Sequence, residues 1–559
     1  MSVKRYSTFR NSILRCYSFC FFCGLPLILS AQGIRSLFEK GSFSAQVQAD
    51  MQYCLKDSAN DTSGDVNRFL SHLYIDGAYN SRMLNAGVRF ELYENPLPGF
   101  EPAYKGYGIP YFYLTLNIGK FSVTGGDFYE QFGSGLILRT YQERLLGIDN
   151  ALRGGRIIYT PFSWMRFKAV AGFQRSYWQW SRSRILGANL ELDIEQWFPA
   201  LHEHNRHLLV EGSFVTKHEK EEFIITMPGK RLNLPMDVGA FSTRLKYQTN
   251  LFTFQGEYAW KANDPSAENH FIYRPGQVLL LTAGYSRKGL GIILGAKHCD
   301  NMSFHSERTI TGNALQLNYL PAFARQHTYA LATLYPYATQ VNGEVAFQAD
   351  VFYKFGKGTV LGDKYGMDIK LNYSHVYSLK KQYEPGQDKS QEGTYGYTTS
   401  LFAIGNETYY RDINIELARR MNKDLKLTLM YMNQQYNDIV RGKNGMIYSH
   451  IGVAEVLWRL KSQVTFRGEI QYLTTRQDLK DWAAALAELS VTSHWMFTVT
   501  DLYNINGSHY PLGSVAYTIG AHRLQLSAGR QREGYNCAGG ICRYVPATKG
   551  FALSYTANF

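Results

Sequence analysis

The side chains best suited to chemistry gather in one glycine-rich segment, residues 125–156. Its acids are Asp127, Glu130, Glu143 and Asp149, and its arginines are Arg139, Arg144, Arg153 and Arg156. Opposite charges that face each other across a lumen form constrictions in some channels. We therefore predict that these eight residues form a candidate pore constriction. The alternative is a structural inward loop that is held by ordinary salt links.

Other patterns that could carry chemistry are weak. His202, His204 and His207 could approach one ion if their connection is a turn, but nothing holds them together, and a polar turn is the simpler interpretation. The stretch 133–135 has glycines on both sides of a serine, but it lacks the lysine and helix start of a phosphate-binding loop. A Gly-x-Ser-x-Gly nucleophile motif is absent from the sequence. We predict no metal site, no cofactor and no catalytic residue.

The beginning of the chain has the features of an export signal. Lys4, Arg5, Arg10 and Arg15 precede an apolar run over residues 16–29. A small residue, Ala31, follows the run, and we predict cleavage after it, so that residues 1–31 are a signal peptide and residues 32–559 the mature chain. The alternative is a membrane anchor, but the apolar run is shorter than the roughly 20 residues that cross a bilayer.

Export predicts an oxidising environment for the cysteines that remain. Cys537 and Cys542 are separated by the sequence Ala-Gly-Gly-Ile, which is flexible enough to close a tight loop. We predict a disulfide between them, because metal binding by two cysteines without nearby histidines is a weaker alternative.

The composition excludes several classes of protein. Of the 559 residues, 15% are aromatic, with 41 tyrosines, and 19% are charged against a usual figure of roughly 25%. The mean hydropathy of −0.28 is too low for a helical membrane protein, and the apolar content of 45% is too high for a disordered chain. Loss of the four basic residues of the signal lowers the formal charge from +13 to +9, and the remaining basic residues are scattered. We therefore predict no nucleic-acid partner.

Apolar and polar residues alternate along the mature chain. The clearest stretches are 43–53, 84–92, 252–260 and 464–472. A period of two predicts strands with one apolar and one polar face. Most of these stretches run for about 9–15 residues, which suits strands that cross a bilayer at a tilt, whereas strands of soluble sandwiches have about 5–6. The predicted fold is an all-β transmembrane antiparallel barrel; a secreted soluble β-helix or sandwich is the alternative.

Connections of alternating length support the barrel. Short turns are predicted near residues 80–82, 119–120, 161–163, 249–250, 287–289, 421–424, 461–462 and 492–494, and long polar loops near 56–66, 94–110, 262–276, 379–395 and 532–548. Outer-membrane barrels have short turns at one rim and long loops at the other. This pattern predicts about 26 strands, with a range of 22 to 28 because the intervals 217–237, 300–344 and 395–412 are ambiguous.

The end of the sequence resembles the terminal signal that barrel-assembly machinery recognises. Residues 551–559 alternate between apolar and polar, with Tyr555 on the apolar face and Phe559 as the last residue. We therefore predict that machinery as a partner, with Tyr555 and Phe559 in the signal.

The segment 125–156 is also predicted to fill the barrel. The first strand is expected about nine residues after the cleavage site, which disfavours a separate plug domain at the N-terminus. A wide barrel leaks unless something occupies it. Because the apolar runs 136–138 and 145–148 would be exposed to water in an outward loop, we expect the segment to fold inward as a lumen plug.

Two motifs carry a resemblance to a known family. They are FYEQFGSGLILRTYQERLLGIDNALRG at residues 128–154 and NCAGGICRYVPATKGFALSY at residues 536–555. The sequence resembles an uncharacterised family of Bacteroidota outer-membrane β-barrel proteins over about residues 41–559. That resemblance implies a barrel and its location, and no activity.

Together these features predict a barrel of the Gram-negative outer membrane, in contact with its lipid and lipopolysaccharide. The expected function is a gated or occluded channel, or the barrel component of an envelope transport or secretion assembly with envelope protein partners. An interaction scaffold without pore activity is the alternative, and a barrel enzyme is a weaker one. Lumen polarity does not reveal a transported substrate.

Overall fold

The computed structural model describes residues 40–56, 68–227, 230–383, 392–443 and 445–559. The predicted signal peptide, residues 1–31, lies outside these ranges. Among the described residues, no helix is long and apolar enough to cross a membrane.

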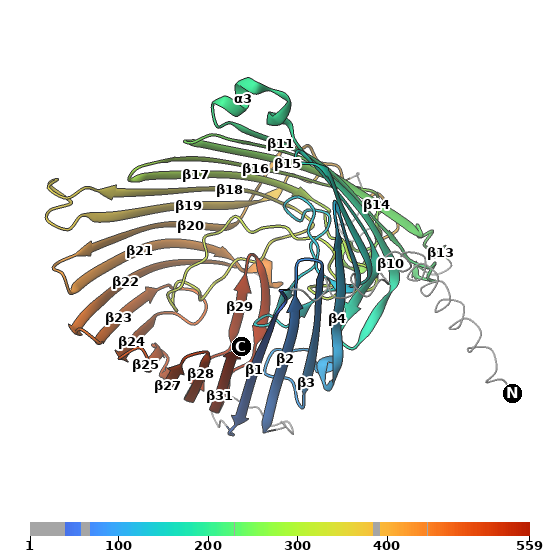
Figure 1. Ribbon diagram of the computed structural model, residues 1–559. Coiled ribbons are helices and arrows are strands. Elements are labelled where there is room, and N and C mark those ends of the chain that lie inside the picture. The colour runs from blue at the N-terminus through green and yellow to red at the C-terminus, as the bar shows by residue number, and fades with distance from the viewer. Residues whose placement is uncertain (1–39, 57–67, 228–229, 384–391, 444) are drawn as a thin grey trace.

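The wall of the molecule is one closed antiparallel β-sheet of 24 strands (Figure 1). In ring order the strands are β1 (Ser42–Cys54), β2 (Phe69–Asn80), β3 (Leu84–Tyr93), β4 (Gly106–Ile118), β5 (Phe121–Phe128), β8 (Leu152–Phe162), β9 (Met165–Ser176), β10 (Gln179–Asp193), β11 (His207–His218), β14 (Asp237–Gln248), β15 (Phe252–Lys261), β16 (Gly276–Arg287), β17 (Leu290–Asp300), β18 (Glu344–Phe355), β19 (Met367–Leu379), β20 (Ile404–Arg420), β21 (Leu425–Asn437), β22 (Met446–Lys461), β23 (Val464–Thr474), β24 (Trp482–Val491), β25 (Trp495–Asn504), β27 (Leu512–Ile519), β28 (His522–Gln531) and β31 (Thr548–Asn558). The ring closes because β1 pairs with both β2 and β31.

The strand number falls within the predicted range of 22 to 28 and is two below the central prediction of about 26. The ambiguous intervals explain the difference. Residues 301–343 contribute no wall strand, and between β11 and β14 the described residues form only the short hairpin of β12 (Ile225–Met227) and β13 (Lys230–Arg231). One further short strand, β26 (Ser508–His509), pairs only with the end of β25.

The predicted alternation defines the two faces of the wall. On β14, Phe241 and Leu245 are 44% and 41% exposed, whereas Val238 and Ala240, which occupy the alternate positions just before them, are buried. Large apolar side chains are exposed in the same way all around the ring, including Ile75, Val88, Leu186, Phe214, Phe254, Leu371, Ile413, Leu429, Ile470, Val499, Leu526 and Phe551. The outer face is therefore an apolar band, and the alternate residues face the lumen.

The connections alternate in length, as predicted. We call the end of the barrel with the connections 81–83, 119–120, 288–289, 462–463 and 520–521 the short-turn rim, and the opposite end the long-loop rim. There are three exceptions. β9 and β10 are joined at the long-loop rim by residues 177–178 alone. The short-turn rim carries the small helices η3 (Ile194–Trp197) and α3 (Pro199–Glu203) between β10 and β11, and the long connection 356–366 between β18 and β19.

Two chain segments lie inside the ring (Figure 1). The first lumen segment, residues 129–151, connects β5 to β8 and contains the short hairpin of β6 (Gln142–Glu143) and β7 (Ile148–Asp149). The second lumen segment, residues 301–343, connects β17 to β18. Both contribute to the main apolar core, which also includes lumen-facing residues of the wall such as Val215 and Val278. The ends of the predicted plug, 125–128 and 152–156, instead belong to the wall strands β5 and β8.

Candidate functional site

The first lumen segment is held by two acids of the wall. The backbone N–H of Gly133 donates to Oε1 of Glu211 on β11 at 2.8 Å, and that of Ser134 donates to Oε2 of Glu257 on β15 at 2.8 Å. Gly133 has a φ of 56°, and a Cβ there would lie 2.5 Å from Oε1 of Glu257. Glycine is needed at this position because the backbone is left-handed and the carboxylate approaches closely.

The apolar part of the same segment packs behind this attachment. Phe132 and the run 136–138 are fully buried in the main core with Val215 of β11. This is the inward packing that was predicted for the run 136–138. In the other predicted apolar run, 145–148, Leu146 and Ile148 are buried, whereas Leu145 in the β6–β7 turn is 76% exposed.

The two lumen segments also bind each other. The N–H of Arg139 donates to the carbonyl of Leu317 at 2.8 Å, and the N–H of Tyr319 donates to the carbonyl of Gly135 at 2.9 Å. The Arg139 guanidinium lies 3.9 Å from the centre of the Tyr319 ring. The two lumen segments therefore form one packed body rather than two independent loops.

Lysines of the wall anchor one side of the second lumen segment. Lys217 of β11 donates through Nζ to the carbonyl of His305 at 2.9 Å. Lys261 of β15 and Lys297 of β17 donate in the same way to the carbonyls of Ser303 and Pro321. All three lysines are buried. The ammonium groups thus satisfy backbone oxygens that have no strand partner.

The other side of the second lumen segment reaches the opposite part of the ring. The N–H of Leu331 donates to Oε1 of Gln471 on β23 at 2.8 Å. The hydroxyl of Tyr335 donates to Oδ2 of Asp478, in the loop after β23, at 3.0 Å. The segment therefore crosses the lumen.

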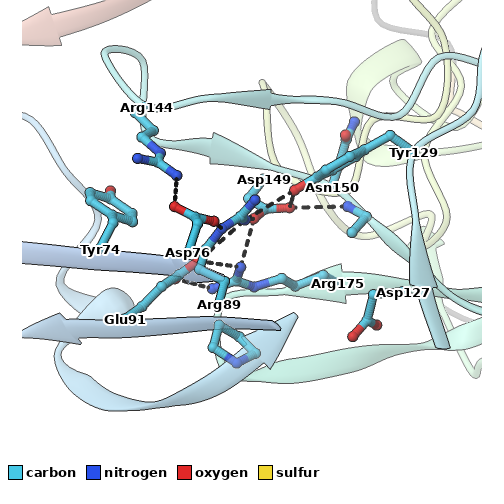
Figure 2. A network of polar contacts seen from close by, with 12 residues as sticks. Tyr74, Asp76, Arg89, Glu91, Asp127, Tyr129, Arg144, Asp149, Asn150 and Arg175 are labelled. Atoms are coloured by element: carbon cyan, nitrogen blue, oxygen red, sulfur yellow. Dashed lines mark hydrogen bonds and ion pairs between the residues drawn. The ribbon is translucent and has the colours of Figure 1, made fainter. Parts of the chain in front are cut away.

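A buried ion-pair network joins the first lumen segment to the wall (Figure 2). Asp149 accepts from Arg89 of β3 at 3.0 Å and from Arg175 of β9 at 2.7 Å. Arg175 also donates twice to Glu91 of β3, at 2.6 and 3.0 Å. The Arg175 and Glu91 side chains are each 1% exposed, so this pair is shielded from water.

The network continues to the β6–β7 hairpin. Asp76 of β2 accepts from Arg89 at 2.6 Å and, through its other oxygen, from Arg144 at 2.6 Å. The network thus contains three acids and three arginines. Such balance matters because an uncompensated buried charge is costly. Burial raises the pKa of Asp149, and the neighbouring Arg175 and Arg89 oppose that shift.

The remaining predicted constriction residues do not meet in one ring. Glu130 pairs with Arg156 of β8 at 3.3 Å and with Lys168 of β9 at 3.4 Å. Arg139 contacts aromatic rings, and Glu143 faces a cavity. Asp127 and Arg153 pair at 2.7 Å between β5 and β8.

The last pair does not face the lumen. Asp127 and Arg153 are cross-strand partners next to Phe128 and Leu152, which are partners in the lumen core. Neighbouring residues of a strand point to opposite faces. The Asp127–Arg153 pair therefore lies on the outer side of the wall, where Arg153 stacks 4.0 Å from the Trp180 ring. These contacts favour the interpretation in which salt links hold the loop and its flanking strands, rather than the one in which the charges form a ring across an open pore.

The sequence interpretation missed the wall half of the network, which consists of Asp76, Arg89, Glu91 and Arg175. A signal was present in the alternation. Arg89 and Glu91 occupy the polar positions of a predicted strand, and Asp76 is the direct cross-strand partner of Arg89. Their role depended on the pairing of β2 with β3, which the sequence alone did not provide.

A disulfide-bonded hairpin covers the lumen segments from the long-loop rim. It consists of β29 (Gly534–Ala538) and β30 (Ile541–Val545), and Cys537 and Cys542 are joined with Sγ atoms 1.99 Å apart. At its tip, the carbonyl of Gly539 accepts from the hydroxyl of Tyr319 at 2.8 Å, and that of Gly540 accepts from the N–H of Thr339 at 3.0 Å. The hairpin is therefore seated directly on the second lumen segment.

The predicted C-terminal signal lies at the seam of the barrel. Tyr555 of β31 pairs with Ala49 of β1, and its hydroxyl lies 2.8 Å from Nδ1 of His522. The Phe559 backbone exchanges hydrogen bonds with Ala45 at 3.1 and 2.8 Å, and its side chain is 64% exposed. Recognition of these residues by assembly machinery stays a prediction.

The histidine-rich connection does not gather its side chains. Nδ1 of His204 lies 2.9 Å from the carbonyl of Ala200, and Nδ1 of His207 lies 3.3 Å from Glu195. The side chain of His202 is outside the described part of the structure. Within the described ranges, no group of three or more His, Cys, Asp or Glu side chains could hold a metal ion.

Comparison with solved structures gives barrels at very low sequence identity. The siderophore receptor PirA from Pseudomonas aeruginosa aligns with a TM-score of 0.39 and 9% identity, covering 92% of this chain and 80% of PirA. The P pilus usher PapC translocation pore aligns with a TM-score of 0.43 and 8% identity, covering 92% and 99%. OccAB3 from Acinetobacter baumannii aligns with a TM-score of 0.36 and 8% identity, covering 93% and 99%.

No functionally curated protein matches the sequence. The profile of one sequence family does match, over residues 12–559, which is nearly the whole chain. The protein therefore belongs to DUF6029, a family of unknown function.

Proposed function

We propose that this protein is a β-barrel of the Gram-negative outer membrane, exported by a signal peptide at residues 1–31. The apolar band on the outer face supports contact with lipid, because water would not favour so many exposed large apolar side chains. The lipid and lipopolysaccharide of that membrane are then its surroundings. Barrel-assembly machinery would recognise the final strand with Tyr555 and Phe559.

We further propose that the barrel is an occluded channel, closed to large solutes by its own two lumen segments. The observation that carries this proposal is the continuous packing of residues 129–151 and 301–343 against each other and against the inner wall. Barrels of 22 strands already enclose a lumen that is wide enough to need a plug. A body that is bound on both sides of the ring would fill such a lumen.

The attachments suit a body that can be released. They combine apolar contacts with hydrogen bonds and ion pairs to lumen-facing residues, while the wall keeps its own closed ladder of backbone hydrogen bonds. A partner or ligand that competes for these groups could open the channel without breaking the wall. This supports a role in transport, alone or as the barrel of an envelope transport or secretion assembly.

The wall geometry permits a direct test by deletion. Phe128 and Leu152 are paired residues, and so are Cys299 and Glu344. A Gly-Ser turn can therefore replace residues 129–151, residues 301–343, or both, without moving the strands. We call the variant that lacks both segments the open-barrel variant.

Cells of a Gram-negative host would express the wild type or the deletion variants. We expect the open-barrel variant to make cells sensitive to large antibiotics that the outer membrane normally excludes, with smaller effects from single deletions. Heat-dependent mobility on gels would show that each barrel has assembled. If an assembled open-barrel variant leaves resistance unchanged, the channel proposal fails and an interaction scaffold becomes the better explanation.

A further inference from the structure

Two neighbouring cavities beside the lumen segments share part of their lining. The long-loop cavity, of about 860 Å³, lies between both lumen segments, β18, β20 and the disulfide hairpin. The short-turn cavity, of about 570 Å³, lies along the inner face of β15 to β19, toward the short-turn rim. Arg325 and Asp350 line both cavities. These two residues therefore mark the junction of a passage along one side of the lumen.

The inner face of β17 leaves space for this passage. Contacts with the second lumen segment show which residues of β17 face the lumen. Lys297 donates to the carbonyl of Pro321, and a Cβ at Gly295 would lie 2.9 Å from the Phe323 ring. Gly291 lies on the same face, farther toward the short-turn rim, and a Cβ there would meet nothing within 4 Å. The second lumen segment thus closes against Gly295 and leaves the wall open at Gly291.

The two charged residues at the junction belong to different parts of the molecule. Arg325 belongs to the second lumen segment, and its guanidinium donates to Asn414 at 2.8 Å and to Glu416 at 3.4 Å, both on β20. Asp350 belongs to β18 and accepts from Gln348 at 2.7 Å and from Asn372 at 2.8 Å. Each side chain is held by its own partners.

Among the described residues, no ion pair joins Arg325 to Asp350; Arg325 instead forms an ion pair with Glu416 at 3.4 Å. Asp350 is held by two neutral amides, which fix its position without neutralising its charge. A solute at the junction would therefore meet the guanidinium of the second lumen segment and the carboxylate of the wall.

We propose that Arg325 and Asp350 form the selective point of a small-solute passage along β17 and β18, and that the passage favours small zwitterions. Such molecules carry an ammonium and a carboxylate, as free amino acids do. The guanidinium suits the carboxylate and Asp350 suits the ammonium, and both groups are already fixed in place. This inference rests on the proposed channel function and adds a substrate class to it.

Liposome swelling would measure the preference of purified protein for serine, a zwitterion, over arabinose, a neutral sugar. We expect wild-type protein to admit serine several times faster than arabinose. Arg325→Gln and Asp350→Asn should each remove most of that preference. Gly291→Trp, which fills the short-turn cavity without changing a charge, should slow both solutes by several-fold.

Ion selectivity in a salt gradient provides an independent readout. Arg325→Gln should shift the reversal potential toward cations, and Asp350→Asn should shift it toward anions. The matched controls are Arg459→Gln and Asp424→Asn, whose side chains are 3.9 Å apart and more than half exposed at the short-turn rim. The controls should leave both readouts unchanged.

The outcomes separate this inference from the channel proposal. If the Arg325 and Asp350 variants behave like the controls, or if only the open-barrel variant admits either solute, the passage is overturned while occlusion stands. If an assembled open-barrel variant also fails to admit solutes, the channel proposal itself is wrong. Heat-dependent gel mobility would confirm assembly of every variant that is compared.

Discussion

Arg175 of the wall strand β9 donates to Asp149 of the first lumen segment at 2.7 Å, at a position where both side chains are almost completely shielded from water. Arg175 belongs to the wall sheet, whereas Asp149 belongs to the connection between β5 and β8 that lies inside the ring. It is a direct physical link between the barrel and the segment that fills it.

Substitution of Asp149 should loosen that link. Asp149→Ala would leave three arginines facing two acids in the buried network, and removal of one partner of a buried ion pair typically costs about 3–5 kcal/mol. We expect hydrogen exchange to accelerate across residues 129–151 and the wall strands to remain protected. Asp368→Ala is the matched control, because its pair with Lys354 at the short-turn rim is 4.0 Å long and more than half exposed on the lysine side. Unchanged exchange in the Asp149 variant would contradict the anchoring role.

The outer face of the wall should reject charge. Val499 in the middle of β25 is 62% exposed on the apolar face, and Thr498 beside it faces the lumen. An arginine at a bilayer-facing position costs about 2–4 kcal/mol at the membrane midplane. Val499→Arg should therefore reduce assembled barrel in vesicles, and Thr498→Arg should be tolerated. Equal losses from both substitutions would show that the membrane assignment or the strand register is wrong.

The cysteines should differ in reactivity. Alkylation of native protein without reductant should modify Cys54, which is partly exposed, and should spare Cys537 and Cys542 because they are bonded. Cys299 is buried and should react only after unfolding. Peptide mass spectrometry would read out each site. Modification of both hairpin cysteines in unreduced native protein would refute the disulfide.

Acid should weaken the attachment of the second lumen segment. Burial lowers the pKa of His305, with Lys217 adding to the shift and Glu268 and Asp264 opposing it. Because the folded imidazole binds a proton less readily than the unfolded one, stability is full above the unfolded value of about 6.5 and falls as the pH drops below it.

Hydrogen exchange of residues 301–343, corrected for its intrinsic pH dependence, should therefore rise between pH 7.5 and pH 5. His305→Gln keeps a polar side chain and removes the titrating group, so its exchange should change less across the same range. An equal change in both proteins would exclude His305 as the source.

The wall was predictable because its cause is local. Alternation in stretches such as 84–92 and 252–260 depends only on neighbouring residues, and it identified the strands, their faces and the alternation of short turns with long loops. The second lumen segment was not predictable in the same way. Residues 301–343 lack a regular period, and some of their partners, such as Gln471, are more than 100 residues away in the chain.

The candidate site was likewise predictable in its local features and not in its long-range pairings. The charges of residues 125–156 were visible as a cluster, but their partners on β2, β3 and β9 become neighbours only when the ring closes. Opposite charges across a passage were expected within that cluster, whereas Arg325 and Asp350, which line both cavities, lie outside it. A pairing between distant strands determines such a site, and one sequence does not contain that pairing in readable form.

The central claim is that residues 129–151 and 301–343 together close an otherwise wide barrel. Single-channel conductance in planar bilayers tests it most directly, with wild-type protein, the two single deletions and the open-barrel variant measured under the same salt. We predict a small conductance for the wild type, an increase for each single deletion and an increase of at least ten-fold for the open-barrel variant. An assembled open-barrel variant that conducts no more than the wild type would contradict the claim.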